Sequence, residues 1–292
     1  MFDLVKTTTQ DGLILNGLYL KGDINKVAVI YIHGFEGDFF SHQFITTIAE
    51  EFRNQKFTFL SVQTRGTSQR SWFATKDGEG SYIGSHLETL DQARLDIDAW
   101  IAFLTNHGYS RVILAGHSLG TLKVVRYLYE GGMSDHVKKI ILICPFDKNG
   151  QENLVTDGKW RSYVIKAKEM IDQGKGSEYI PVETDTPWEE VSMSYQTFYS
   201  WYFEDELGCM FDLYRRAYNF PILNKIRIPV HIIVGSRDEF FHRTNMDNPK
   251  EGLEILIKNL KFGTGRMIGN ATHNFRGYEE ILVEEIVEFC SI

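Results

Sequence analysis

Mostly apolar runs alternate with amphipathic segments along most of the chain. The apolar runs occupy residues 27–32, 57–62, 112–115, 139–144 and 230–234. A run with little polar alternation is typical of a strand buried on both faces of a parallel sheet. Between these runs apolar residues recur at helical spacing, as in 44–52 and 87–107, which predicts helices. The pattern predicts an α/β fold with a mostly parallel central sheet and helices on both faces.

The first twenty residues depart from this alternation. Strand-like runs at 4–9 and 13–20 flank Asp11-Gly12. An Asp-Gly pair between two such runs is a strong turn signal, so this segment predicts an antiparallel hairpin.

The alternation also stops from 146 to 220. Ten of the 26 residues from Tyr195 to Phe220 are Phe, Tyr or Trp. We therefore expect one α/β-type core, formed by residues 1–145 and 221–292, that carries an inserted cap or lid subdomain at 146–220.

Composition narrows the expected partners and location. The 292 residues carry a net charge of −8, and this acidic balance argues against a nucleic-acid binder. No stretch approaches the roughly 18 consecutive apolar residues of a membrane span. Three scattered cysteines are too few for a disulfide framework or a zinc site, which favours free thiols and a cytoplasmic location. We expect a small-molecule partner, and the sequence leaves room for a homo-oligomer.

The strongest chemical signal is Gly116-His117-Ser118-Leu119-Gly120, which fits G-x-S-x-G between a buried strand and a helix. Such a sharp turn lifts the serine hydroxyl out of the sheet, and its glycines let strand and helix pack closely. Ser118 is therefore the candidate nucleophile. A serine hydroxyl is weak at neutral pH, so it needs a positioned base.

The base and its acid partner follow from chain order, which places the acid and then the histidine after the serine. Of nine histidines, only His273 lies in a loop after the last predicted strand. Asp238 follows the run that ends at Val234 and is the preferred acid, which would orient the imidazole. Asp147, which follows the strand ending at Cys144, remains the alternative acid.

Acyl transfer also needs hydrogen-bond donors aimed at the developing oxyanion. The backbone N–H after the nucleophile, here Leu119, is one candidate. The second comes from the loop after an earlier strand, where Phe35 lies within His33-Gly34-Phe35-Glu36-Gly37. This chemistry requires neither a metal nor an organic cofactor.

The set formed by 33–35, 116–120, Asp238 and His273 resembles the α/β-hydrolase superfamily over the whole chain except 146–220. Further motifs resemble a poorly characterised branch related to fungal siderophore (fusarinine-type) esterases. They are His33-Gly-Phe-Glu-Gly-Asp38, Thr64-Arg65-Gly66, Asp96-Ile-Asp-Ala-Trp100 and the segment 116–121. The cap departs from those esterases. The resemblance implies a serine esterase.

The function predicted from these residues is hydrolysis of a small or medium carboxylic ester through an acyl-enzyme. Phe198, Trp201 and Tyr202 of the expected cap, together with Arg65, are candidates for lining a covered apolar and aromatic pocket. The same triad would also serve a thioesterase or a carbon–carbon bond hydrolase. A non-catalytic relative that binds a small ligand, and a partner-binding module with exposed cap aromatics, are further alternatives.

Overall fold

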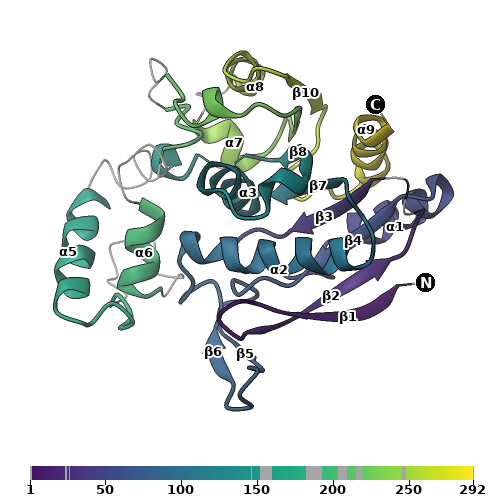
Figure 1. The fold of residues 1–292 in the computed structure, drawn as a ribbon. Helices are drawn as coiled ribbons and strands as arrows, with labels where there is room; N and C mark the ends of the chain where they lie inside the picture. Colours follow the sequence, from purple (N-terminus) through teal and green to yellow (C-terminus); the bar gives the residue numbers. More distant parts are fainter. Residues whose placement is uncertain are drawn as a thin grey trace.

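The computed structural model describes residues 2–291 apart from 24, 26, 146, 152–159, 182–192, 203–208, 215–218 and 245–247. Within these residues the centre is one eight-stranded sheet with the order β1-β2-β4-β3-β7-β8-β9-β10 (Figure 1). Its strands are β1 (Asp3–Thr8), β2 (Ile14–Leu20), β3 (Ala28–Ile32), β4 (Thr58–Val62), β7 (Val112–His117), β8 (Val137–Ile143), β9 (Val230–Gly235) and β10 (Gly263–Ile268). β1 and β2 pair antiparallel, β2 and β4 do the same, and all pairings from β4 to β10 are parallel.

Helices cover both faces of this sheet, as the sequence predicts. They are α1 (Phe44–Gln55), α2 (Ala93–Asn106), α3 (Leu119–Glu130), α7 (Glu239–Thr244), α8 (Pro249–Lys258) and α9 (Glu279–Ser291). In β3, Val29 and Tyr31 face the apolar cluster that contains α1 and α9. Ala28, Ile30 and Ile32 face the opposite cluster, which contains α2 and α3. Because successive strand residues point to opposite faces, a continuous apolar run supplies both layers.

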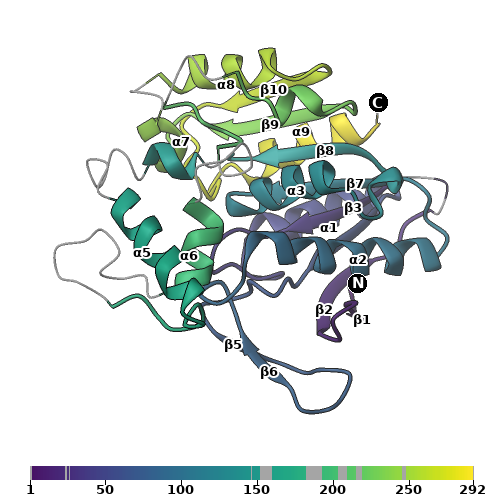
Figure 2. The ribbon, with the colours of Figure 1, turned by 60° about the vertical axis from the view of Figure 1, so that its left-hand side comes forward.

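The predicted N-terminal hairpin is confirmed, with Asp3 opposite Tyr19 and Thr8 opposite Ile14. A second, smaller hairpin joins β5 (Ser71–Phe73) and β6 (Ser81–Ile83), where the sequence pattern predicts no element. It projects from the body in Figures 1 and 2. Its strands carry Trp72 and Tyr82, each 55% exposed, with ring centroids 4.8 Å apart.

The expected cap at 146–220 is described in part, since its first residue and several stretches fall outside the described residues. Two helices, α5 (Trp160–Asp172) and α6 (Tyr195–Tyr202), lie side by side at one end of the molecule in Figures 1 and 2. The amide of Leu90, in a short 3-10 helix that precedes α2, donates to the Ser200 hydroxyl of α6 at 3.3 Å. This contact joins α6 to the core.

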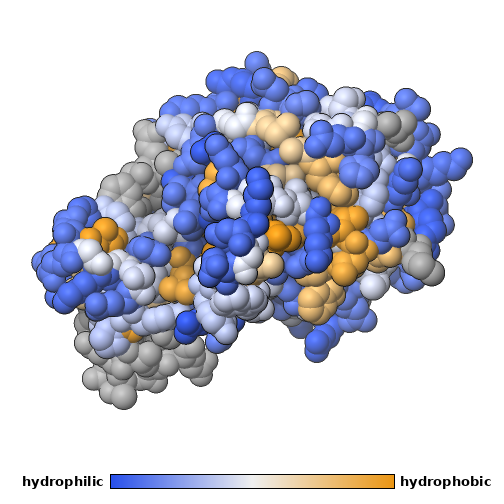
Figure 3. Space-filling model, turned by 60° about the horizontal axis from the view of Figure 1, so that its bottom comes forward, coloured by the Kyte–Doolittle hydropathy of each residue, from blue (hydrophilic) through white to orange (hydrophobic). Residues whose placement is uncertain are grey.

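The surface in Figure 3 is mainly hydrophilic, with apolar residues gathered across its middle. Among the described residues no helix combines the length and the apolar character that crossing a bilayer requires.

Candidate active site

Ser118 occupies the sharp turn between β7 and α3 and adopts φ +55° and ψ −124°. A non-glycine residue in such a conformation costs about 1–3 kcal/mol, so the surroundings must hold it. The Ser118 N–H donates to the Ile143 carbonyl of β8 at 2.9 Å. Its carbonyl accepts from the Thr121 N–H at 2.9 Å and the Thr121 hydroxyl at 2.6 Å. The parallel strand on one side and the first helical turn on the other thus fix the strained residue.

Glycines let three backbone segments meet at this turn. A Cβ on Gly116 would lie 2.4 Å from the Gly120 carbonyl oxygen, and one on Gly120 would lie 2.3 Å from that of Ile32. A Cβ on Gly34 would lie 2.8 Å from the Ser118 Cβ. The loop after β3, residues 33–37, therefore lies directly against the serine. Because it carries Phe35, it is the predicted oxyanion loop.

His273 and Asp238 come together from the loops after β10 and β9. The distance from His273 Nδ1 to Asp238 Oδ1 is 2.9 Å, and the two side chains are only 7% and 1% exposed. Burial opposes a charged carboxylate, but the hydrogen bond and charge of His273 outweigh it, so the pKa of Asp238 lies below its ordinary value. With Nδ1–H donating to the carboxylate, Nε2 of a neutral imidazole remains an acceptor.

His117 ties the histidine loop to the serine turn. Its Nε2–H donates to the His273 carbonyl at 2.9 Å, and the two rings are 4.9 Å apart. Burial, followed by the neighbouring His273, holds the pKa of His117 well below its ordinary value, so it acts as a neutral donor. The base candidate is thereby held beside the residue that precedes Ser118.

Three buried residues, His117, Cys144 and His273, each bring one potential metal-ligand atom within 4.8 Å of the others. The Cys144 thiol donates to the same His273 carbonyl at 3.6 Å, while His273 Nδ1 donates to Asp238. Metal binding by this group would cost the Cys144 hydrogen bond, because a metal-bound cysteine is deprotonated, whereas His117 Nδ1 has no partner among the described residues.

The two predicted oxyanion donors are free to act. Within the described part of the chain, the backbone N–H groups of Phe35 and Leu119 have no hydrogen-bond acceptor. Leu119 is the first residue of α3, where the helix dipole favours a negative charge. The Phe35 ring packs edge-on against Trp201 of α6 at 5.0 Å and lies parallel to His86 at 5.8 Å. Helix α6 thus packs on the loop after β3 that carries the predicted donor Phe35.

His33, which precedes a glycine at the end of β3, stabilises this loop through both ring nitrogens. Nδ1–H donates to the Gly34 carbonyl at 2.8 Å, and Nε2 accepts from the Thr64 and Thr67 hydroxyls, each at 3.0 Å. Burial lowers the pKa of His33 to about 3. The ring therefore stays neutral in one tautomer.

A buried ion pair continues the same network. Lys123 Nζ lies 2.8 Å from Glu88 Oε2, and both side chains are 0% exposed. Lys123 Nζ also donates to the Thr64 hydroxyl at 3.4 Å. Because Lys123 belongs to α3, which follows Ser118, this pair links that helix through Thr64 to His33 and the loop after β3. Lys123 lies four residues after Leu119, on the same buried face of α3. A charged residue at such a position is the signal in the sequence that could have revealed the ion pair.

The predicted pocket residues of the cap are buried on α6. Phe198 and Tyr202 pack against each other at 4.7 Å, and Tyr202 also packs against Trp160 of α5 at 6.0 Å. Trp201 is the member that contacts the oxyanion loop, through Phe35. Among the described residues, its buried indole N–H has no partner.

The prediction that Arg65 lines the substrate pocket is wrong. Arg65 is 1% exposed, and its guanidinium donates to Asp96 at 2.9 and 3.0 Å and to Asp11 at 3.0 and 3.2 Å. Two carboxylates on opposite sides leave no open face for a substrate anion. Arg65 instead joins the N-terminal hairpin to α2.

Asp147, the alternative acid, binds backbone rather than a histidine. Its carboxylate accepts from the N–H groups of Gly150, Leu213 and Tyr214 at 2.9, 2.9 and 3.0 Å. Burial, followed by the charge of Asp212, raises the pKa of Asp147 to about 7. Asp238, not Asp147, is the carboxylate that pairs with His273.

Comparison with known proteins places the chain in a family. The model of a family described as protein of unknown function (DUF1749) matches residues 11–206. No curated protein matches the chain.

Solved structures with the same architecture include DcsB in complex with its substrate analogue. Its TM-score is 0.66 at 16% identity, over 100% of this chain and 99% of that one. The α/β hydrolase GrgF from Penicillium sp. sh18 gives 0.66 at 15% identity, over 99% and 98%. Est1E from Butyrivibrio proteoclasticus, with ferulic acid bound, gives 0.62 at 18% identity, over 97% and 96%. At these identities the similarity shows the α/β-hydrolase fold, as the sequence resemblance predicts.

Proposed function

The chain belongs to the DUF1749 family, whose members are α/β-hydrolase-like, and we propose that it is a serine hydrolase of small or medium carboxylic esters. One observation carries this proposal. A buried His273–Asp238 pair, with 2.9 Å between Nδ1 and Oδ1, is tied to the residue beside a strained serine at a strand–helix turn. A binding protein has no need for this combination.

In the proposed mechanism Ser118 Oγ attacks the ester carbonyl carbon while His273 Nε2 takes its proton. Asp238 holds the imidazole orientation and stabilises the imidazolium that forms. The free N–H groups of Phe35 and Leu119 donate to the tetrahedral oxyanion. His273 then protonates the leaving alkoxide, which leaves an acyl-enzyme on Ser118. A water molecule, deprotonated by His273, attacks the acyl carbon. The bond from that carbon to Ser118 Oγ then breaks, His273 returns the proton to Ser118 Oγ, and the carboxylic acid leaves.

The aromatic residues of the expected cap indicate which esters the enzyme would accept. We assign 146–220 as the cap subdomain on a core of 1–145 and 221–292, because Trp201 of α6 packs on the oxyanion loop. Buried aromatic rings on α6 favour substrates with an apolar or aromatic acyl group. Est1E, a structural neighbour, holds ferulic acid, an aromatic acid, so aromatic esters belong in the substrate panel.

A fluorophosphonate probe tests the mechanism without knowledge of the substrate. Intact mass should show one adduct per parent chain and none on Ser118→Ala. Ser110→Ala, at an exposed serine, is the matched control and should be labelled like the parent. A folded parent that stays unlabelled would count against an activated serine and in favour of a non-catalytic ligand-binding protein.

The same protein then separates the alternative reactions. A panel of p-nitrophenyl esters, acyl thioesters and vinylogous 1,5-diketones should show the largest kcat/KM for the esters. Preference for a thioester or a diketone would replace the ester assignment by a thioesterase or a carbon–carbon bond hydrolase.

We also propose a cytoplasmic location. Cys144 and Cys290 are buried and form no disulfide among the described residues, which is expected of a protein in a reducing compartment.

A further inference from the structure

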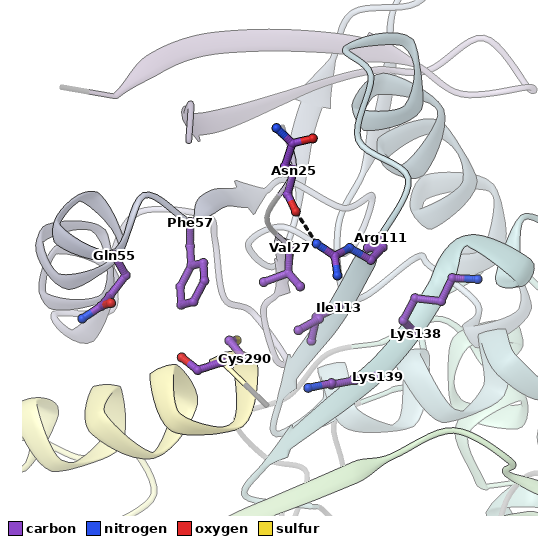
Figure 4. A pocket seen from close by; sticks show the side chains of 10 residues that line it. Asn25, Val27, Gln55, Phe57, Arg111, Ile113, Lys138, Lys139 and Cys290 are labelled. Atoms are coloured by element: carbon purple, nitrogen blue, oxygen red, sulfur yellow. Dashed lines mark hydrogen bonds between the residues drawn. The ribbon is translucent and has the colours of Figure 1, made fainter. Parts of the chain in front are cut away.

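A cavity lies at the amino ends of the parallel strands, whereas Ser118 lies at their carboxyl ends. It has a volume of about 430 Å³, within the range of about 300–1,000 Å³ usual for small-molecule sites. The amino ends of β3 and β7, the start of β8, the end of α1 and the last turn of α9 surround it (Figure 4). Ser118 follows the carboxyl end of β7, so the two sites do not share residues.

Positive charge collects at this cavity although the chain as a whole carries −8. Its lining includes Arg111, Lys138 and Lys139 and, among the described residues, no carboxylate. The hydrogen bonds that these three groups make to the described residues all go to backbone carbonyls. Arg111 donates to Asn25, Lys138 to Asp135 at 2.6 Å, and Lys139 to Phe289 at 2.8 Å. None of the three forms an ion pair with any part of the chain that the structure describes.

Lys139 is the most confined of these charges. It is half-buried, and its ammonium lies 5.0 Å from the centre of the Phe289 ring. Burial lowers the pKa of Lys139; the neighbouring Cys290 thiol partly offsets this effect, and the positive charge of Arg111 adds to it. A half-buried ammonium beside a guanidinium, with no counter-charge among the described residues, is stabilised when an anion binds.

The cavity also has an apolar wall. Val27, Phe57 and Ile113 lie between Arg111 and the end of α9, and their side chains project into the space that Figure 4 shows. Arg111 approaches this wall from one side and Lys139 from another, whereas the Lys138 amine extends away from the other residues. A ligand that satisfies all these groups carries a compact anionic head and a small apolar body.

We propose that this cavity binds a small organic phosphate, with the phosphate between Arg111 and Lys139 and its apolar part on Val27, Phe57 and Ile113. A phosphate dianion matches the two cations in charge, and a planar guanidinium can donate two hydrogen bonds to it. The site is separate from the proposed esterase chemistry and does not depend on it.

Calorimetry with phenyl phosphate tests the proposal directly. One saturable site is expected on the parent, weaker binding of inorganic phosphate and no binding of phenol. Arg111→Met and Lys139→Met should each weaken phenyl phosphate at least about tenfold, because each removes a charge-assisted hydrogen bond. Lys166→Met, which removes the same charge from an exposed position on α5 outside the cavity, should bind like the parent.

Two further measurements distinguish this cavity from the ester site. Protein whose Ser118 has reacted with the fluorophosphonate should bind phenyl phosphate unchanged, and loss of binding there would place the phosphate in the ester site. The ligand should raise the Tm of the parent but not that of Arg111→Met. Absence of saturable binding at millimolar phenyl phosphate, or equal weakening in all three variants, would overturn the proposal.

Discussion

The buried Lys123–Glu88 pair offers the sharpest test of how the core is held around the serine turn. Lys123→Met keeps the length and apolar stem of the side chain but removes its charge. Glu88 then keeps a carboxylate at 0% exposure, and its Oε1 already has no hydrogen-bond partner among the described residues. A Cβ on Gly66 would lie 2.1 Å from that oxygen, so the backbone at residue 66 closes over the carboxylate on that side.

The expected loss in the free energy of unfolding is about 3–5 kcal/mol, the usual cost of leaving one charge of a buried pair uncompensated. The double variant Lys123→Met/Glu88→Leu removes both charges and should recover most of this loss. Lys168→Met is the matched control. It breaks an exposed pair with Asp172 on α5 and should cost no more than about 0.5 kcal/mol.

Urea unfolding followed by tryptophan fluorescence measures these differences, since Trp100 is fully buried. The deficit of Lys123→Met should also depend on pH. Burial raises the folded-state pKa of Glu88 above its ordinary value, and loss of the lysine charge raises it further. The loss in the free energy of unfolding of Lys123→Met is therefore complete above that folded-state pKa. It disappears as the pH falls below the pKa of Glu in the unfolded chain, about 4.3.

Two results would refute this reasoning. One is a loss below about 1 kcal/mol for Lys123→Met, which would mean that water or a rearranged partner compensates Glu88. The other is a double variant no more stable than the single one. The fluorophosphonate reaction provides a second readout. If the pair positions the oxyanion loop through Thr64 and His33, the labelling rate of folded Lys123→Met should fall while that of Lys168→Met should not.

Four further outcomes are expected. Asp238→Asn should lower the rate of ester hydrolysis about 10³–10⁴-fold, whereas Asp147→Asn should leave it close to the parent's; similar rate losses would undo the choice of acid. Asp96→Asn should lower the free energy of unfolding in urea by about 3–5 kcal/mol, and Asp11→Asn by about 1 kcal/mol or less. The difference is expected because the Asp96 side chain is 0% exposed and that of Asp11 is 42% exposed. Equal losses would contradict the burial argument. The pKa of Asp238 is lowered in the folded protein. Its pairing with His273 therefore stabilises the fold above the unfolded pKa of about 3.9, and this stabilisation is lost as the pH falls through the lower folded pKa. The parent should lose more stability than Asp238→Asn in acid urea titrations, and identical stability profiles of the two proteins would contradict the pairing. Gly34→Ala should slow fluorophosphonate labelling, since its Cβ would lie 2.8 Å from that of Ser118; an unchanged rate would show that the loop can move aside.

The sequence predicts the parts of the molecule that lie in the loops at the carboxyl ends of the parallel strands. Buried apolar runs identify the parallel strands, and their carboxyl ends must share one edge of the sheet. Residues that follow β3, β7, β9 and β10 are therefore expected to meet, and the structure brings Gly34 against Ser118 and His273 onto Asp238. The fold class is confirmed, while the roles of these residues in catalysis remain a proposal.

Interactions between distant polar residues are what the pattern misses. Arg65 contacts Asp96 and Asp11, which lie 31 and 54 residues away, and nothing local to Arg65 indicates them. For the Lys123–Glu88 pair, a lysine at a buried helical position indicates an ion pair, but nothing near it in sequence identifies Glu88, 35 residues away, as the partner. Until its partners are known, a lone arginine in a loop resembles a substrate contact as much as a structural one.

The candidate site also has a consequence for how the chain acquires activity. His117 and His273 are 156 residues apart in sequence yet hydrogen-bonded, and the strand that precedes His273 is the last to join the sheet in chain order. Contacts of such large separation form late, because loop-closure entropy opposes them until other contacts exist. During synthesis on the ribosome the serine turn can fold well before its base is available. Hydrolytic activity is therefore acquired late in folding. The onset of fluorophosphonate reactivity would report when β9 and β10 join the sheet.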